Sequence, residues 1–215
     1  FPYTTLFRST ALRETPNITL SALIQMNRAK TVDDWLTAMC GYVGPDVNVA
    51  FAHEDGTIGL LVAGRTPIRT QNHPGNGALP ADGSDETHAW NGIYTCDKNA
   101  VVTDPASGII TTANASVITD GFPFKGNEYY AAPGRQQRIQ DLLEAERNHT
   151  IATFSSIQND GVSLDVNRLL GVLTQLESED SELQDAITLL RNWDGNWANA
   201  NAEAVIYIYW RTELG

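Results

Sequence analysis

Residues 48–63, NVAFAHEDGTIGLLVA, decide the fold class. Two apolar runs, residues 48–52 and 57–63, lie on either side of the polar turn at 53–56. An Asp-Gly pair between two such runs is typical of a β-hairpin. The sequence therefore predicts two antiparallel strands of a buried sheet.

Helical patterns lie on both sides of this hairpin. Upstream, Thr31 is placed to cap a short helix, with Asp33 and Asp34 at its positive end. Downstream, residues 135–147 have helical spacing, Ser163 and Ser181 each open a further helical segment, and the last one runs from about residue 203 to 214.

The stretch between the hairpin and the downstream helices has little periodicity. Residues 64–97 are rich in Gly, Pro, Asn and Asp, which predicts a long surface loop of the kind that often serves a site. A third strand is expected at residues 109–113, after the turn DPASG. Because strands come first and helices follow, the sequence predicts an α+β fold.

Charge and length limit the possible partners. The chain has 215 residues and a net charge of −12, with 26 acidic and 14 basic residues. This charge argues against nucleic acid or an anionic membrane as the main partner, because both would be repelled. No apolar run is long enough to span a membrane. Cys40 and Cys96 form no CxxC motif; they could pair in an oxidising compartment, but two separate half-buried thiols are the expectation.

The first nine residues, FPYTTLFRS, resemble the translation of a common sequencing adapter. They lack both an initiator Met and the apolar core of a signal peptide. We therefore expect residues 1–9 to be an artefact and residues 10–215 to be an internal segment of a longer protein, incomplete at both ends.

Two residues are candidates for a site on physical grounds. Asn114 follows the expected strand, where its amide could stabilise an oxyanion, or could simply end the strand as a turn residue. Arg135 opens a helix, an unfavourable place for a cation, so it either has a specific partner or is an exposed, solvated side chain. The sequence His53-Glu54-Asp55 could contribute to a cation site, although a solvated acidic turn is the expected interpretation. No GxSxG, Walker, HExxH or GxGxxG motif is present.

Several motifs in order resemble the penicillin acylase family of N-terminal-nucleophile hydrolases. They are NVAFAHEDGTIGLLVAGRTPIR at 48–69, WNG at 90–92, DPASGIITTAN at 104–114, GRQQRIQDLLE at 134–144, IQND with Ser163, and LLRNWDG at 189–195. The sequence departs from the family pattern at His53, where an Asp is usual, and at Ala115, where a second Asn is common.

The resemblance implies an αββα hydrolase that cuts its own precursor and uses a new N-terminal Ser, with its α-amine as base, to cleave an amide through an acyl-enzyme. It implies that Asn114 forms the oxyanion hole and that Arg135 supports Asn114. The nucleophile, which the family carries upstream, is absent from this segment, so we expect the segment to be inactive alone.

The resemblance also gives expectations about substrates and partners. The substrate would be a small-molecule N-acyl amide, such as a penicillin, a cephalosporin or an acyl-homoserine lactone. The partners would be the small (alpha) chain and the missing parts of the large (beta) chain from the same precursor, in the periplasm or secreted. No cofactor is expected, and only the resemblance allows a structural Ca²⁺. The alternative is a non-catalytic relative or binding domain, in which Asn114 only ends a strand.

Overall fold

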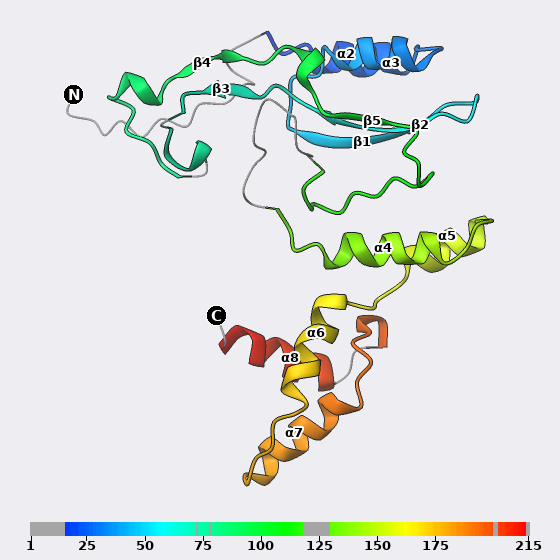
Figure 1. Ribbon diagram of the computed structural model, residues 1–215, viewed down its shortest axis with the longest axis vertical. Coiled ribbons are helices and arrows are strands. Elements are labelled where there is room, and N and C mark those ends of the chain that lie inside the picture. The colour runs from blue at the N-terminus through cyan, green and yellow to red at the C-terminus, as the bar shows by residue number, and fades with distance from the viewer. Residues whose placement is uncertain (1–15, 72, 78, 118–129, 200–201, 214–215) are drawn as a thin grey trace. The chain divides into compact units, whose positions relative to one another are not determined.

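The computed structural model describes residues 16–71, 73–77, 79–117, 130–199 and 202–213 (Figure 1). These residues form two compact units. The first contains the described residues up to Thr112 and those between Ser116 and Tyr130; the second contains Ala113–Ala115 and the described residues from Ala131 onward. Residues 1–9 lie outside the described residues, so their interpretation as an artefact stays a prediction.

The described part of the first unit contains two helices and two small antiparallel sheets. The helices are α2 (Thr19–Met26) and α3 (Val32–Met39). The strands are β1 (Val47–Ala52), β2 (Ile58–Ala63), β3 (Pro67–Arg69), β4 (Trp90–Ile93) and β5 (Val101–Thr103), and short 3-10 turns lie at Pro74–Gly77, Glu86–His88 and Cys96–Lys98. One sheet has the order β1-β2-β5, and the other pairs β3 with β4.

The predicted hairpin is confirmed. Strands β1 and β2 pair antiparallel from Val47 opposite Ala63 to Ala52 opposite Ile58. Gly56 closes the turn at φ 98°, a conformation that favours glycine. Along β1, residues 47, 49 and 51 are half-buried while 48, 50 and 52 are exposed, so one face of the sheet carries the core.

Helices α2 and α3 lie side by side on that face of the sheet (Figure 1). The predicted cap of α3 is confirmed, because the Thr31 hydroxyl accepts a 3.0 Å hydrogen bond from the Asp34 amide. Sequence reasoning did not predict α2. The core between helices and sheet consists of Ala22, Met39, Tyr42, Leu61 and Ala63, with Leu23, Met26, Trp35, Leu36, Val47 and Val49 packed against it.

In the β1–β2 hairpin, the ring of Phe51 packs over Gly59. Phe51 and Gly59 are opposite each other in the register. A Cβ built on Gly59 would lie 2.0 Å from Phe51 Cζ, so the ring occupies the space that a side chain would fill. Trp35 of α3 packs on the Phe51 ring with centroids 4.8 Å apart. The absence of a side chain at residue 59 thus lets the helix layer approach the sheet.

The prediction of a third strand at residues 109–113 is wrong. The third strand of the hairpin's sheet is β5, at Val101–Thr103, and it pairs with β2. The Val62 amide donates to the Ala100 carbonyl and the Asp104 amide donates to the Ile58 carbonyl, so β5 occupies this edge of β2. Residues 109–113 form no strand, and the Asn48 side-chain amide holds them through a 2.7 Å hydrogen bond to the Thr112 hydroxyl.

The described residues between 64 and 97 are more ordered than the predicted loop. They contain the β3–β4 pair, in which Pro67 is opposite Ile93 and Arg69 is opposite Trp90. The Tyr94 amide also donates to the Thr66 carbonyl. The apolar residues of these short strands are separated by turn-forming residues, which hid the strand pattern in the sequence.

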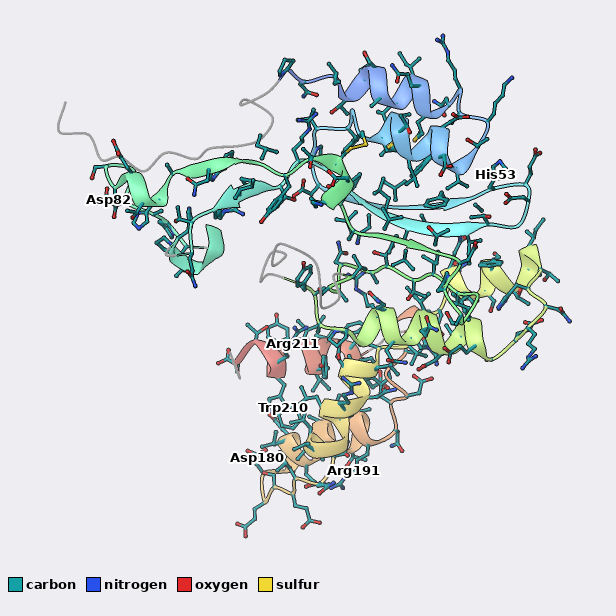
Figure 2. All side chains as sticks on the ribbon, turned by 45° about the horizontal axis from the view of Figure 1, so that its top comes forward. His53, Asp82, Asp180, Arg191, Trp210 and Arg211 are labelled. Atoms are coloured by element: carbon teal, nitrogen blue, oxygen red, sulfur yellow. A yellow bond between two sulfur atoms is a disulfide. The ribbon has the colours of Figure 1, made fainter. Side chains whose placement is uncertain are left out.

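The expectation of two separate thiols is also wrong. Cys40, at the end of α3, forms a disulfide with Cys96, with Cα atoms 5.2 Å apart (yellow bond, Figure 2). Their sequence separation of 56 gave no sign of this proximity. The bond joins α3 to the segment between β4 and β5 and encloses the hairpin in one covalent loop.

The second unit is helical where it is described. Its helices are α4 (Gly134–Glu144), α5 (Ile151–Gln158), α6 (Leu164–Leu173), α7 (Ser181–Arg191) and α8 (Ala202–Glu213), with a short 3-10 turn at Trp197–Asn199. The predicted start of α6 is confirmed, because the Ser163 hydroxyl accepts from the Val166 amide. Helix α7 begins where predicted, but its cap is Asp180, whose carboxylate accepts from the Glu182 and Leu183 amides.

Aromatic side chains fill the core of this unit. Trp193, Trp197 and Tyr207 meet edge to face, with centroids 5.4 to 6.0 Å apart. They pack with Val166, Leu170 and Leu190 and with the half-buried Leu169, Ile206 and Trp210. Arg191, labelled in Figure 2, ends α7 and donates to the Thr174 and Leu176 carbonyls, which joins α7 to the end of α6.

Candidate functional site

Asn114 occupies a special backbone position. Its φ is 62°, in the left-handed region, which Asn tolerates better than most residues. Its neighbours Ala113 and Ala115 are both buried, and its carbonyl accepts a 2.8 Å hydrogen bond from the Ala131 amide. The residues on both sides are thus fixed while the Asn114 side chain remains exposed.

Arg135, in the first turn of α4, holds the side chain of Asn114. Its Nη2 donates to Asn114 Oδ1 and to the Ala113 carbonyl, each at 3.0 Å. A guanidinium only donates hydrogen bonds, so the amide oxygen must face Arg135 and the NH₂ group must face away. No described residue accepts a hydrogen bond from Asn114 Nδ2. The pair therefore presents an oriented amide donor.

This contact also explains the placement of a cation at a helix N-terminus. The first turn of α4 repels positive charge through the helix dipole, and its N-cap, Pro133, offers no side-chain bond. The hydrogen bonds from Arg135 to Asn114 Oδ1 and to the Ala113 carbonyl offset this unfavourable interaction with the helix dipole. The structure thus brings together the two predicted site residues, although it leaves their catalytic roles untested.

Helix α4 is attached to the other helices by contacts that sequence reasoning missed. Arg138 makes a two-pronged ion pair with Asp160, with both N–O distances 2.8 Å. Each residue stabilises the charged form of the other, so the pKa of Asp160 is lowered and that of Arg138 is raised. The signal in the sequence was the three-residue spacing of Arg135 and Arg138, which places both on the same side of a helix.

The Trp-Asp-Gly element at 193–195 forms a tight turn beside the loop that carries Asp160. Gly195 has φ 74°, and a Cβ there would lie 2.0 Å from Asn167 Oδ1. The Gly195 carbonyl accepts from the Ser163 amide, and the Trp197 amide donates to the Gly161 carbonyl. The Trp-Asp-Gly element and the IQND–Ser163 segment, both noted in the sequence, therefore meet through backbone hydrogen bonds.

The GRTPIR element, residues 64–69, lies in the first unit, and its Arg69 acts electrostatically on the carboxyl group of Asp46. Burial raises the pKa of Asp46, and the nearby Arg69 partly offsets this. A Cβ on Gly64 would lie 2.0 Å from Asp46 Oδ1, and Gly64 has φ 137°. The backbone of this motif at Gly64 therefore packs against the Asp46 carboxylate.

In the His53-Glu54-Asp55 turn, both ring nitrogens of His53 contact other groups of the protein. His53 Nε2 lies 3.1 Å from the Lys30 carbonyl, and Nδ1 lies 3.0 Å from Asp55 Oδ1. The bond to Asp55 raises the pKa of His53, whereas the Thr57 amide and His53 lower that of Asp55 to about 2. Within the described part of the chain, no group of three or more His, Cys, Asp or Glu side chains could hold a metal ion, and we assign no calcium-binding residue.

The sequence matches the family described as Penicillin amidase over residues 3–215. The chain belongs to the penicillin amidase family. It is 27% identical over 211 residues to acyl-homoserine lactone acylase QuiP of Pseudomonas aeruginosa, covering 92% of this chain and 24% of that protein. It is 30% identical over 208 residues to the penicillin acylase 2 proenzyme of Pseudomonas sp. strain SE83, covering 96% of this chain and 26% of that protein. The chain thus spans about a quarter of the length of these relatives.

The fold matches a solved member of this family. The thermostable penicillin G acylase from Alcaligenes faecalis aligns with a TM-score of 0.67 at 21% identity, covering 88% of this chain and 34% of that one. This likeness confirms the predicted α+β class. The family match over residues 3–215 confirms the resemblance to penicillin acylases. No helix among the described residues is long and apolar enough to cross a membrane.

Proposed function

We propose that this chain is part of an amidohydrolase that cleaves an N-acyl amide into a carboxylic acid and an amine. Membership of the penicillin amidase family supports this function, as do relatives named for acylase activity. The substrate class we propose includes penicillins or cephalosporins and acyl-homoserine lactones, because relatives named for both kinds of activity match nearly the whole chain.

One observation carries the assignment of residues. Asn114 presents an exposed side-chain NH₂ group whose orientation is set by the 3.0 Å bond from Arg135 to its oxygen. A preorganised amide donor is suited to stabilise the negative oxygen of a tetrahedral intermediate. We assign Asn114 to the oxyanion hole and Arg135 to the orientation of Asn114.

We assign the rest of the chemistry to an N-terminal Ser, which the family resemblance places upstream of this segment. An N-terminal Ser would attack the amide carbonyl while its α-amine takes the hydroxyl proton. The oxyanion would accept a hydrogen bond from the Asn114 side-chain N–H, the α-ammonium would pass its proton to the leaving nitrogen as the tetrahedral intermediate expels the amine, and water would then release the acid from the acyl-enzyme. Without that Ser we expect the 215-residue chain to be inactive alone.

This mechanism implies a precursor and partner chains. We propose that the chain works with a small chain and with further parts of its own large chain, as the proenzyme name of one relative suggests for that relative. We further propose a periplasmic or secreted location. The Cys40–Cys96 disulfide supports an oxidising compartment, because such bonds are rare in reducing ones.

The test is the variant Asn114→Ala in the full-length protein that carries this chain. We expect kcat for amide hydrolysis to fall by about 100- to 1000-fold, as on loss of other oxyanion donors. Circular dichroism should show an unchanged fold, because the Asn114 side chain is exposed. Near-normal turnover would refute the role of Asn114.

The competing hypothesis of a non-catalytic relative is tested with the same protein. An acylase precursor should cut itself into two chains, one beginning with Ser, which N-terminal sequencing detects. A full-length protein that stays uncut and releases no amine from penicillin G or an acyl-homoserine lactone would favour the non-catalytic alternative.

A further inference from the structure

The ion pair between Arg138 and Asp160 is well formed, and the function proposed above does not use it. The guanidinium donates through Nε to Asp160 Oδ2 and through Nη2 to Oδ1. The two side chains are only 28% and 17% exposed. A bidentate pair of this kind fixes direction as well as distance. It therefore limits how α4 can rotate about its axis.

The acidic partner belongs to a firmly held loop. Asp160 lies between α5 and α6, and the next residue, Gly161, accepts a 2.9 Å hydrogen bond from the Trp197 amide. Two residues further on, the Ser163 amide donates to the Gly195 carbonyl. The loop is thus fixed to the turn at 193–195, so it can act as an anchor for α4.

A second contact holds the start of α4. Gly134 is buried, and a Cβ there would lie 2.4 Å from Asp165 Oδ2 in the first turn of α6. The contacts at residues 134 and 138 lie on either side of Arg135 in the sequence. Together they set both the rotation of α4 and the position of its first turn, from which Arg135 reaches Asn114.

We propose that Asp160 is a positioning residue: through Arg138 it fixes α4 so that Arg135 meets Asn114 Oδ1 and aims the Asn114 amide. This inference rests on the proposed function, in which that amide binds the oxyanion. The lowered pKa of Asp160 means that its carboxylate stays ionised at neutral pH and keeps the link intact.

The main test is Asp160→Asn in the full-length protein. Because small misplacements of catalytic groups cost up to about 100-fold in rate, we expect kcat to fall about 10- to 100-fold with KM nearly unchanged. The matched control is Asp185→Asn, the same substitution at an exposed position of α7 in the same unit. The control should keep wild-type kcat.

A double-mutant cycle separates positioning from general destabilisation. If Asp160 acts through Asn114, then Asp160→Asn should reduce kcat in the wild-type background but hardly reduce the residual kcat of Asn114→Ala. An equal fold-loss in both backgrounds, or no loss in the wild-type background, would overturn the proposal.

A second variant tests the proposal in case Asp160→Asn does not fold. The double variant D160N/R138Q removes both charges and leaves neither unpaired, and it should show the same dependence on Asn114. If this variant also failed to fold, the pair would be a requirement of folding and the proposal would be wrong. Normal turnover of Asn114→Ala would refute the proposed function, whereas loss in Asn114→Ala without loss in Asp160→Asn would refute positioning alone.

Discussion

The Cys40–Cys96 disulfide should contribute strongly to the stability of the first unit. The perturbation is the double variant C40S/C96S, which removes the cross-link without leaving a free thiol. The bond closes a loop with a sequence separation of 56. For a loop of this size, the chain-entropy relation gives about 4 kcal/mol at 25 °C through restriction of the unfolded chain.

The assay is hydrogen exchange read by mass spectrometry, because it reports the two units separately. A loss of about 4 kcal/mol corresponds to roughly a thousandfold faster exchange for amides that exchange by opening of the whole unit. Peptides from the β1–β2 hairpin should show this acceleration. Peptides from α6 and α7 provide the internal control, because the disulfide lies in the other unit.

Two results would refute this reasoning. Unchanged exchange in the hairpin would mean that the cross-link does not restrain the first unit. Equal acceleration in α6 and α7 would mean that the effect is not confined to the covalent loop. Reduction of the wild-type protein should reproduce the variant, which guards against an effect of the serines themselves.

Three further changes have defined outcomes. Gly59→Ala should destabilise the first unit by about 1–3 kcal/mol in urea melts, because the new Cβ displaces the Phe51 ring. Thr31→Ala should cost about 1 kcal/mol in the same melts through loss of the α3 cap. His53 should titrate in NMR above its ordinary pKa of 6.5, because Asp55 raises that pKa. Its stabilising contribution is then present at low pH and is lost as pH rises through the raised pKa.

Each of these has its own control. Gly171→Ala, in α6, meets nothing within 4 Å and should stabilise that helix rather than destabilise it. Thr37→Ala, at an exposed position inside α3, should leave stability nearly unchanged. Asp55→Asn should return the pKa of His53 toward 6.5. A destabilised Gly171→Ala, a Thr37→Ala loss equal to that of Thr31→Ala, or an unmoved His53 pKa would each contradict the corresponding explanation.

Local signals predicted much of the fold. The Asp-Gly turn, the Thr31 cap and the Ser163 cap act within a few residues, so the sequence alone could place the hairpin and the starts of α3 and α6. Strand β5 was missed because its three exposed residues have no alternating pattern, and its pairing depends on an edge of β2 some forty positions earlier. The disulfide was missed for the same reason, since proximity across a long loop is a tertiary property.

The candidate site was predictable only in part. Asn114 and Arg135 were candidates on physical grounds and took their expected roles from the family resemblance, whereas the positive φ of Asn114 and the bond between the two appeared only in three dimensions. Arg138 and Asp160 lie in two of the quoted motifs, but nothing in those motifs indicates that the two residues pair. Their pairing depends on how α4 packs beside the loop before α6, which periodicity does not specify.

The division of the chain also affects how members of this family can be recombined. The tripeptide Ala113–Ala115 belongs to the helical unit, although the residues just before and just after it belong to the other unit. A chimera of two relatives joined between residues 130 and 131 would therefore take Asn114 from one parent and Arg135 from the other. The helical unit is not a contiguous stretch of gene, so such exchanges keep the Asn–Arg pair only when both parents carry it.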